Sequence, residues 1–520
     1  MWYIKLMMGI REKFSFIKPG EVRTRFAPSP TGFLHIGSAR TALFNYLFAK
    51  KNQGTFILRI EDTDRERSNP KFEKDIINTL KLLGIEWNEG PYRQSERKGI
   101  YAKYLEKLLE NGKAYRCFCS QEELEAKRQE QMSRGVAPKY NGKCAGLSSK
   151  GIKERLAKGE KYIIRFKTLS KKISFDDLIR GKIEFDSDLI GDFSLAKDLN
   201  TPLYNFSVVV DDFEMKISHL IRGEDLLPNT PKQILIQEAL GFPKIKYAHL
   251  PLILGPDRSK MSKRHGAVSV KEYLDQGYLP ETLINFLAFL GWNPGTEREI
   301  FSLASLIKEF SLEKVQKSGA IFNIKKLDYL NGFYLRQKSL DKLTELCIPY
   351  LIKQNLIEPF LKSEQYPPAY GGIVISQDFI TNNKEKISFN QLENIISLYQ
   401  ERLKKVSEIG ELVDFFFLDK LNYDKDLLRW KDMTDEEIKN ILDQLINILS
   451  KIKIWNKENI ENNLKTVGEK DKGKVLWPFR AALSGKKASA GPFEIAELLG
   501  KEKTLKRLNE AKIKIWSVNI

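Results

Sequence analysis

Residues 22–38 read VRTRFAPSPTGFLHIGS, and this stretch decides the fold. Its first five residues have the character of a β-strand, and residues 38–50 carry apolar side chains at helical spacing. The residues that follow predict a second strand at 56–60 and a second helix at about 72–83. Because strand and helix alternate in this way in doubly wound parallel sheets, the sequence predicts an α/β fold.

The same alternation returns in a later part of the chain. Strands are expected at 207–210, 217–221 and 249–254, with a helix at 231–240. Between the two halves lies a Lys- and Gly-rich stretch with three cysteines, which we interpret as an inserted α+β domain. Helical periodicity dominates after residue 270, and Thr434 to Glu437 form a capping box that predicts a helix start.

These patterns predict a split, Rossmann-like catalytic domain followed by all-α C-terminal domains. The expected divisions are an N-terminal extension at 1–20, the first catalytic half at 21–114, the inserted domain at 115–204, the second catalytic half at 205–270, a helical domain at 271–340 and a second helical domain at 341–520.

Composition and charge narrow the class of partner. The 520 residues contain 86 Lys and Arg against 68 Asp and Glu, a net charge of +18. A surplus spread along the whole chain suits a broad polyanion such as a nucleic acid, because basic side chains release counterions from phosphates. The sequence contains no apolar run of about twenty residues, so no membrane span is expected. Four cysteines are too few for a disulfide framework, which favours the cytoplasm.

The crossing from the first strand to the first helix has the features of a phosphate site. Pro28 and Gly32 stiffen the crossing, and His35 places an imidazole beside the helix start. Gly37 removes a side chain, so that a phosphate can approach the free N–H groups of the first turn. Doubly wound sheets bind ligands at such crossings, although a His-x-Gly tripeptide alone is more often a turn.

A second cationic element lies more than two hundred residues further on. Lys260 and Lys263 stand three residues apart, between Gly255 and Gly266. Such a loop could close over a triphosphate and stabilise the charge that develops on departing pyrophosphate. Taken alone it is a solvated basic turn, but with the first element it indicates nucleotide chemistry.

Together the two elements resemble the paired signatures of class I aminoacyl-tRNA synthetases. The signatures are residues 35–38 and 260–264, and residues 25–32 and 59–64 narrow the resemblance to the bacterial-type glutamyl-tRNA synthetases. Further similar stretches are 204–206, 209–212, 222–225 and 479–485. The resemblance extends from about residue 21 to residue 510.

This resemblance implies ATP- and Mg²⁺-dependent activation of L-glutamate to an adenylate, followed by transfer to the 3′ end of tRNA(Glu), by a monomer. Family members characteristically need tRNA before they activate glutamate. The glutamate site implied is Arg25 for the side-chain carboxylate, Arg222 for the α-carboxylate, Glu61 with Ser29 and the Ala27 backbone for the ammonium, and the Tyr204 hydroxyl. The ATP site implied is Pro28, Gly32, His35, Gly37, Ser38, Lys260, Met261, Ser262, Lys263 and Arg264, with His35, Lys260 and Lys263 as catalytic residues.

Three cysteines of the inserted domain, Cys117, Cys119 and Cys144, have a spacing compatible with structural zinc. Zinc-binding relatives carry a further ligand two residues after the third cysteine, where this chain has Gly146. Two interpretations stay open: Tyr140 or water completes a zinc site, or the thiols are free.

Arg402 resembles an arginine that reads the last anticodon base, and it is equally typical of a solvated surface. Other functions also stay open. One is charging of tRNA(Gln) as well as tRNA(Glu), and another is a glutaminyl-tRNA synthetase, although that family carries β-barrels where this chain is helical. A third is a short glutamylating enzyme that modifies a tRNA base, but that enzyme lacks an anticodon domain and this chain is too long for it. The remaining two are a small-molecule nucleotidyltransferase and an RNA-binding protein without catalysis.

Overall fold

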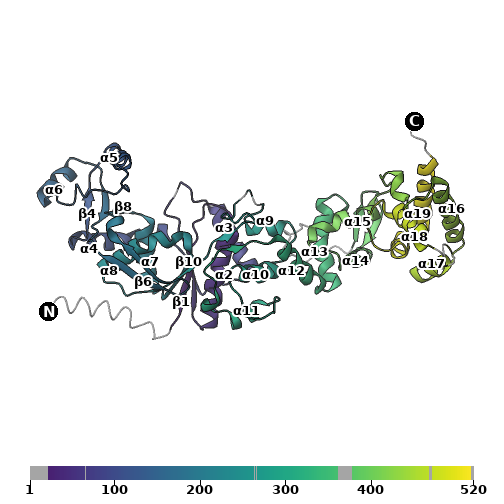
Figure 1. Ribbon diagram of the computed structural model, residues 1–520, viewed down its shortest axis with the longest axis horizontal. Coiled ribbons are helices and arrows are strands. Elements are labelled where there is room, and N and C mark those ends of the chain that lie inside the picture. The colour runs from purple at the N-terminus through teal and green to yellow at the C-terminus, as the bar shows by residue number, and fades with distance from the viewer. Residues whose placement is uncertain are drawn as a thin grey trace. The chain divides into compact units, whose positions relative to one another are not determined.

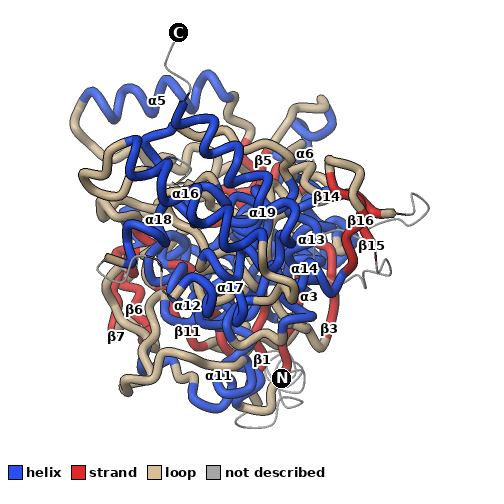
Figure 2. The backbone as a smooth tube through the Cα atoms, turned by 90° about the vertical axis from the view of Figure 1, so that its right-hand side faces the viewer, coloured by secondary structure: helices blue, strands red, loops and turns tan. Residues whose placement is uncertain are grey.

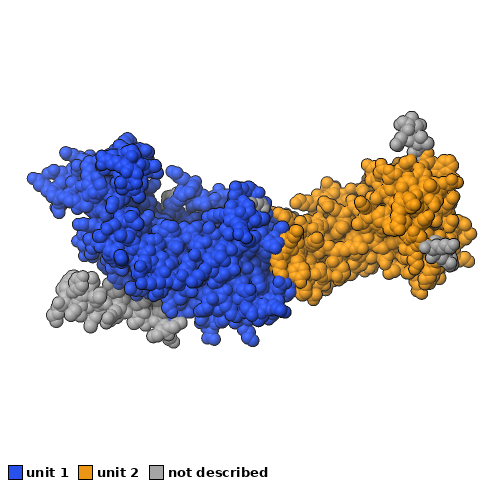
Figure 3. Space-filling model, viewed as in Figure 1, with its two compact units in different colours: residues 1–274, 280–324 blue, residues 275–279, 325–520 orange. Residues whose placement is uncertain are grey.

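A computed structural model describes residues 21–64, 66–262, 264, 266–360, 378–465, 467 and 471–516. The expected N-terminal extension at 1–20 lies outside these residues. The described chain forms two compact units, coloured separately in Figure 3. Unit 1 extends to residue 274 and includes 280–324, and unit 2 comprises 275–279 and the residues from 325 onward.

A parallel sheet forms the centre of unit 1. Strands β1 (Arg23–Phe26), β2 (Thr55–Ile60) and β3 (Glu89–Arg93) pair in parallel, with β2 in the middle. Strands β10 (His219–Gly223) and β11 (Lys246–Leu250) form a second parallel pair. The two sets meet where the Ser218 N–H donates to the Arg23 carbonyl oxygen, 3.0 Å away. The order is therefore β3-β2-β1-β10-β11, and the split Rossmann-like fold is confirmed.

Helices pack on this sheet (Figure 1). Helix α2 (Ile36–Lys51) follows β1, α3 (Pro70–Leu82) follows β2 and α8 (Thr230–Leu240) follows β10. One expectation is wrong: residues 207–210 belong to helix α7 (Tyr204–Glu214). Their three valines favour a strand in isolation, but they are buried against the core, and this packing overrides the local preference.

The inserted region combines helices with short strands. Helix α4 (Lys98–Glu110) leads into an antiparallel sheet, and a hairpin of β6 (Lys172–Asp177) and β7 (Gly181–Asp186) joins the edge of β11 at Tyr247. The other strands of the region are β4 (Ala114–Cys117), β5 (Ile163–Phe166), β8 (Ser194–Asp198) and β9 (Thr201–Pro202), and its helices are α5 (Gln121–Ser133) and α6 (Ser149–Ala157). The hairpin makes the central sheet continuous with the insertion.

The rest of unit 1 is short helices and one small parallel pair. These elements are β12 (Ile253–Leu254), α9 (Val270–Asp275), α10 (Pro280–Phe289), α11 (Leu303–Glu309) and β13 (Ala320–Ile321). Pro280 begins α10 as expected, because proline suits the first turn of a helix.

Unit 2 is mainly helical around its own apolar core. Its helices are α12 (Ile324–Arg336), α13 (Leu340–Lys353), α14 (Phe389–Ser397), α15 (Ile409–Phe417), α16 (Asp435–Ser450), α17 (Lys457–Leu464), α18 (Lys472–Ser484) and α19 (Pro492–Trp516). Thr434 and Glu437 form the expected capping box at the start of α16. The expectation of purely α-helical structure needs one correction. Figure 2 shows a small antiparallel sheet of β14 (Ile357–Pro359), β15 (Asp378–Thr381) and β16 (Lys386–Ser388).

Within the described residues, no helix is both long enough and apolar enough to cross a membrane.

Candidate active site

A cavity of about 410 Å³ opens at the carboxyl ends of β1 and β10. The strand order reverses between these two strands, and doubly wound sheets leave a crevice at that point. The predicted site residues that line the cavity are Arg25, Ala27, Pro28, Ser29, His35, Gly37, Ser38, Glu61, Tyr204, Arg222, Lys260 and Met261. Both sequence elements and both halves of the sheet therefore contribute to one site.

Four predicted residues are not placed in this wall. Gly32, Ser262 and Arg264 are described by the structure but do not line the cavity. Arg264 donates a hydrogen bond of 2.7 Å to the Ser259 hydroxyl. Lys263, the principal catalytic candidate, lies outside the described residues.

Arg25 is held by a buried carboxylate at one end of the cavity. Its Nε donates to Oδ1 of Asp212 over 3.1 Å, and Nη1 of Arg59 donates to the same oxygen over 2.8 Å. Burial alone would raise the pKa of Asp212, but the charges of Arg25 and Arg59 outweigh it and lower that pKa. The carboxylate thus stays ionised and holds Arg25 by its hydrogen bond. Removal of either partner would leave an uncompensated buried charge.

Glu61 shares this ion network. Nη2 of Arg59 donates to Oε1 of Glu61 over 3.1 Å, and Glu61 is 7% exposed. Burial raises the pKa of Glu61 despite the attraction of Arg59 and Arg25. An ammonium group bound beside it would favour the ionised carboxylate. Tyr204 lines the same end, and burial raises the pKa of its hydroxyl.

Arg222 differs from Arg25 because no described carboxylate pairs with it. The residue is 2% exposed, its Nε donates to Nε2 of His249 over 3.2 Å, and its Nη2 donates to the Thr230 hydroxyl over 2.9 Å. Nη1 has no hydrogen-bond partner within the described residues. Burial lowers the pKa of this guanidinium. A buried, partly unsatisfied cation beside a cavity is a site for an anionic group.

His35 caps helix α2 in another part of the cavity wall, to which Lys260 also belongs. Its Nδ1 accepts a hydrogen bond of 3.1 Å from the Gly37 N–H, at the first turn of α2. Burial, with a contribution from the charge of Lys260, lowers the pKa of His35. Because Nδ1 accepts from the Gly37 N–H, the ring proton lies on Nε2, which makes Nε2 a hydrogen-bond donor. A donor at a helix N-terminus suits a phosphate group.

Lys260 is the exposed cation of this part of the wall. Its side chain is 65% exposed, and its Nζ lies 3.8 Å from Oδ2 of Asp225. Met261 beside it is buried, and its N–H donates to the Ile253 carbonyl oxygen over 3.0 Å. The backbone is thus anchored at Met261 while the Lys260 amine remains accessible.

Several residues of the site are absent from the sequence-based prediction. Asp212 and Arg59 belong to recognised stretches, but their role as buried partners of Arg25 follows only from the structure. Arg40 lines the cavity from α2 and donates to the carbonyl oxygens of Leu290 and Pro251. The sequence signal for Arg40 was its position one helical turn after Ile36, close to the helix start where a phosphate site was expected.

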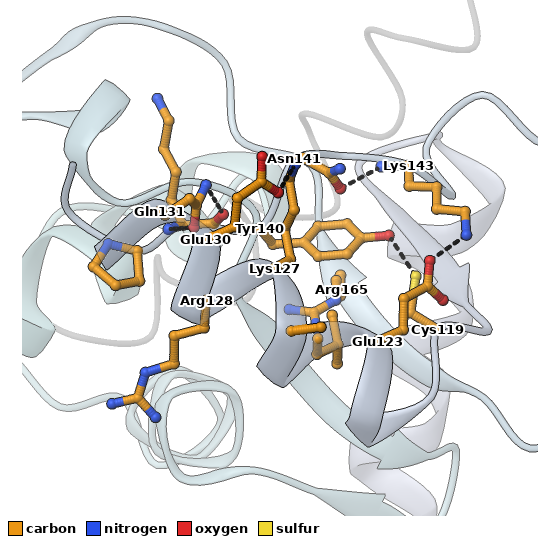
Figure 4. Close-up of a pocket in the computed structure, with 14 residues that line it drawn as sticks. Cys119, Glu123, Lys127, Arg128, Glu130, Gln131, Tyr140, Asn141, Lys143 and Arg165 are labelled. Atoms are coloured by element: carbon orange, nitrogen blue, oxygen red, sulfur yellow. Dashed lines mark hydrogen bonds and ion pairs between the residues drawn. The ribbon is translucent and has the colours of Figure 1, made fainter. Parts of the chain in front are cut away.

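The three cysteines of the insertion come together in the structure. One of them, Cys119, lines a second cavity with Tyr140 (Figure 4). Their sulfur atoms all lie within 4.8 Å of one another, and the Sγ atoms of Cys119 and Cys144 are 3.7 Å apart. The Tyr140 hydroxyl lies 3.3 Å from Sγ of Cys117 and 3.4 Å from Sγ of Cys119. Tetrahedral zinc with bonds of about 2.3 Å places its sulfur ligands about 3.8 Å apart, so this arrangement fits the ion.

Arg402 lies in a turn after α14 and not on a helix. The residue is exposed, and its Nη1 donates to the Ser489 carbonyl oxygen over 2.6 Å. Arg480 hydrogen-bonds the hydroxyl of the same serine, so two arginines meet at one loop of unit 2.

Comparison with known proteins identifies the class to which this fold and site belong. The family described as "tRNA synthetases class I (E and Q), catalytic domain" matches residues 21–329, and the family described as "Anticodon binding domain" matches residues 342–512. The chain is therefore a member of the class I tRNA synthetases.

Relatives narrow the family further. "Glutamate--tRNA ligase 1" of Caldicellulosiruptor saccharolyticus is 47% identical over 94% of this chain and 98% of its own length. "Glutamate--tRNA ligase" of Carboxydothermus hydrogenoformans is 44% identical over 94% and 99%. The crystal structure of a glutamate tRNA ligase from Elizabethkingia meningosepticum, in complex with its amino acid, matches with a TM-score of 0.81 and 34% identity, covering 95% of this chain and 99% of that one. The chain belongs to the glutamate–tRNA ligase family.

Proposed function

We propose that this chain is a glutamate–tRNA ligase that forms glutamyl-adenylate from L-glutamate and ATP and transfers the glutamyl group to the 3′ end of tRNA(Glu). The observation that carries the proposal is Arg222, a buried guanidinium at the cavity with an unpartnered Nη1. A substrate with two carboxylates and one ammonium matches two buried arginines and one buried glutamate.

The residue roles follow from this match. Arg25 binds the side-chain carboxylate of glutamate, and Arg222 binds its α-carboxylate. Glu61, with Ser29 and the Ala27 backbone, binds the ammonium, and Tyr204 adds a hydroxyl. An oxygen of the α-carboxylate then attacks the α-phosphorus of ATP, and the bond to pyrophosphate breaks. Such a displacement needs positioning and charge stabilisation and no protein nucleophile.

The triphosphate is assigned to the part of the cavity wall that contains His35 and Lys260. The helix start at His35 and Gly37 binds phosphate oxygens, with Mg²⁺ carried by the nucleotide. Lys263 and Lys260 stabilise the pyrophosphate as it leaves. The remaining candidates for nucleotide contact are Pro28, Gly32, Ser38, Met261, Ser262 and Arg264.

We assign tRNA to the rest of the chain, in the divisions that the sequence predicts. The inserted domain at 115–204 binds the acceptor stem, the helical domain at 271–340 contacts the stem, and 341–520 binds the anticodon. A net charge of +18 supports a polyanionic partner. We further propose that the enzyme acts as a monomer in the cytoplasm.

Glutamate-dependent exchange of pyrophosphate into ATP tests the reaction. We expect exchange with glutamate, and we measure it with and without tRNA(Glu) and with glutamine as the matched amino acid control. Exchange with glutamine in place of glutamate would overturn the assignment. A chain that binds tRNA but gives no exchange in any arm would be an RNA-binding protein without this chemistry.

Discrimination between tRNAs is assigned to Arg402. Arg402→Gln removes two forked donors, so we expect it to reduce the preference for tRNA(Glu) over tRNA(Gln) by about 1–3 kcal/mol. Adenylate formation should not change, because Arg402 does not line the cavity assigned to that reaction. An unchanged charging ratio would make Arg402 a surface residue, and equal charging of both tRNAs by the unaltered chain would define a non-discriminating enzyme.

Zinc is proposed as a structural ion of the insertion. Cys117, Cys119, Cys144 and Tyr140 would hold it, and it would fix the loop between α5 and α6. We expect one zinc per chain by elemental analysis. Tyr140→Phe should weaken retention against a chelator, whereas Tyr162→Phe, elsewhere in the insertion, should not. If zinc is supplied during purification and the purified chain contains none, the result would support free thiols.

A further inference from the structure

Behind the cavity lies a group of buried polar side chains that the roles above do not use. His249 and Thr230 are both 0% exposed, and Asp177 is 4% exposed. None of the three lines the cavity. His249 and Thr230 hydrogen-bond to Arg222, which does line it, and Asp177 hydrogen-bonds to His249. They come from β11, α8 and the end of β6, so the folded chain alone brings them together.

The hydrogen bonds of this group fix which atom of His249 carries the proton. Arg222 has only donors, so Nε2 of His249 must accept the hydrogen bond of 3.2 Å from Nε of Arg222. The ring proton therefore sits on Nδ1, which donates to Oδ2 of Asp177 over 2.6 Å. The Thr230 oxygen lies 3.1 Å from the same Nε2 and accepts from Nη2 of Arg222. A second proton, on Nε2, would remove this acceptor and place a second cation beside Arg222.

Asp177 itself is held from several sides. Its Oδ1 accepts from the N–H groups of Ile179 and Arg180, each over 2.9 Å, and its Oδ2 accepts from the His249 N–H over 3.1 Å. These donors leave the carboxylate little freedom, so its direction is set by the β6–β7 hairpin. The hairpin is part of the insertion, and the Leu178 N–H anchors it to the Tyr247 carbonyl oxygen over 2.8 Å.

We propose that Asp177 and His249 are positioning residues for the carboxylate-binding Arg222, and this inference rests on the proposed function. Asp177 holds His249 in the Nδ1–H form, and His249 with Thr230 binds Nε and Nη2 of the guanidinium. Two of its three nitrogens are thereby occupied on the protein side, and Nη1 is the nitrogen left for the α-carboxylate of glutamate. The inserted domain thus contributes Asp177 to the positioning of Arg222 at the amino-acid site.

A matched pair of substitutions at His249 tests this arrangement in the full-length chain. In His249→Gln the side-chain amide reaches the position of Nε2, so its oxygen can still accept from Arg222. In His249→Asn the amide reaches only the position of Nδ1, so the contact with Asp177 persists and the acceptor for Arg222 is lost. We expect His249→Asn to raise KM for glutamate about tenfold or more, because a hydrogen bond to a charged group is lost. His249→Gln should raise it much less, and KM for ATP and for tRNA should stay unchanged in both.

The outcomes separate the inference from the proposed function. Equal KM changes in the two variants, or equal changes for glutamate and ATP, would overturn the inference while leaving the ligase activity standing. A wild-type chain that does not charge tRNA with glutamate would instead overturn the proposed function. If thermal unfolding shows that His249→Asn does not fold, Thr230→Val replaces it. This nearly isosteric change removes the acceptor of Nη2 together with the hydroxyl beside Nε2 of His249, and it must again raise KM for glutamate selectively.

Discussion

The cations proposed to bind glutamate and those proposed to act on the triphosphate differ in how exposed they are to solvent. At the glutamate end the cations are buried, with Arg25 and Arg222 only 4% and 2% exposed. Of the cations proposed for the triphosphate, Lys260 in the cavity wall has a side chain that is 65% exposed, and Arg264, outside that wall, has one that is 66% exposed. Hydrogen bonds to other elements fix Arg25 and Arg222. Arg264 instead bonds Ser259 of its own loop, and Lys260 lies 3.8 Å from Asp225. Under the proposed roles, the difference teaches that amino-acid recognition uses buried cations fixed by the fold, whereas the charge toward the phosphates comes from exposed side chains.

Removal of Arg222 should have the largest effect. Arg222→Met takes away a buried cation and leaves a bound carboxylate unpaired, so we expect kcat/KM for glutamate to fall about 1,000-fold, since breaking a buried charge pair costs several kcal/mol. Aminoacylation at varied glutamate concentrations measures the loss. Arg222→Lys is the matched control because it keeps the charge but lacks the planar fork, and it should recover only part of the activity. A loss below tenfold in Arg222→Met would mean that the buried end does not bind glutamate.

Lys263 should rank second. Lys263→Ala removes a charge that acts on the leaving pyrophosphate, so we expect adenylate formation to slow on the order of 100-fold. KM for glutamate should stay near its wild-type value, because the glutamate end is formed by other residues. Single-turnover formation of adenylate separates the rate from binding. A parallel loss of glutamate affinity would show that the two ends do not act independently.

Lys260 should give the smallest of these effects. Its amine is mostly exposed and pairs with Asp225 only over 3.8 Å, so water and salt screen its charge. We expect Lys260→Ala to slow adenylate formation about tenfold or less, and the effect should shrink as ionic strength rises. The same change in rate at low and high salt would argue that Lys260 is desolvated when ATP binds. Lys260 would then resemble the buried cations Arg25 and Arg222.

The sequence could predict the parts of the site that lie in continuous stretches. Arg25 and Arg222 lie near the carboxyl ends of β1 and β10, Glu61 directly follows β2, and His35 caps α2. Each belongs to a recognisable motif, and the structure places all four at one cavity. The topology of a doubly wound sheet explains why, since the carboxyl ends of its strands meet at one edge.

What the sequence could not predict depends on tertiary contact. Asp177 and His249 are 72 residues apart, and no local pattern joins a hairpin of the insertion to strand β11. Likewise, Asp212 balances both Arg25 and Arg59 only after α7 has packed against the sheet. The prediction of a strand at 207–210 was wrong for the same reason. Burial in the core, and not the intrinsic preference of the valines, decides the helical conformation of this segment.

The hairpin of β6 and β7 limits how the insertion can be exchanged between relatives. In sequence it belongs to a segment that interrupts the catalytic domain, but in space its first strand extends the catalytic sheet at β11. A chimera that replaced everything between α4 and α7 would therefore strip a strand from the edge of that sheet. The natural junctions for domain exchange lie inside the insertion, around the antiparallel sheet that carries Cys117, with the whole hairpin at 172–186 retained from the recipient.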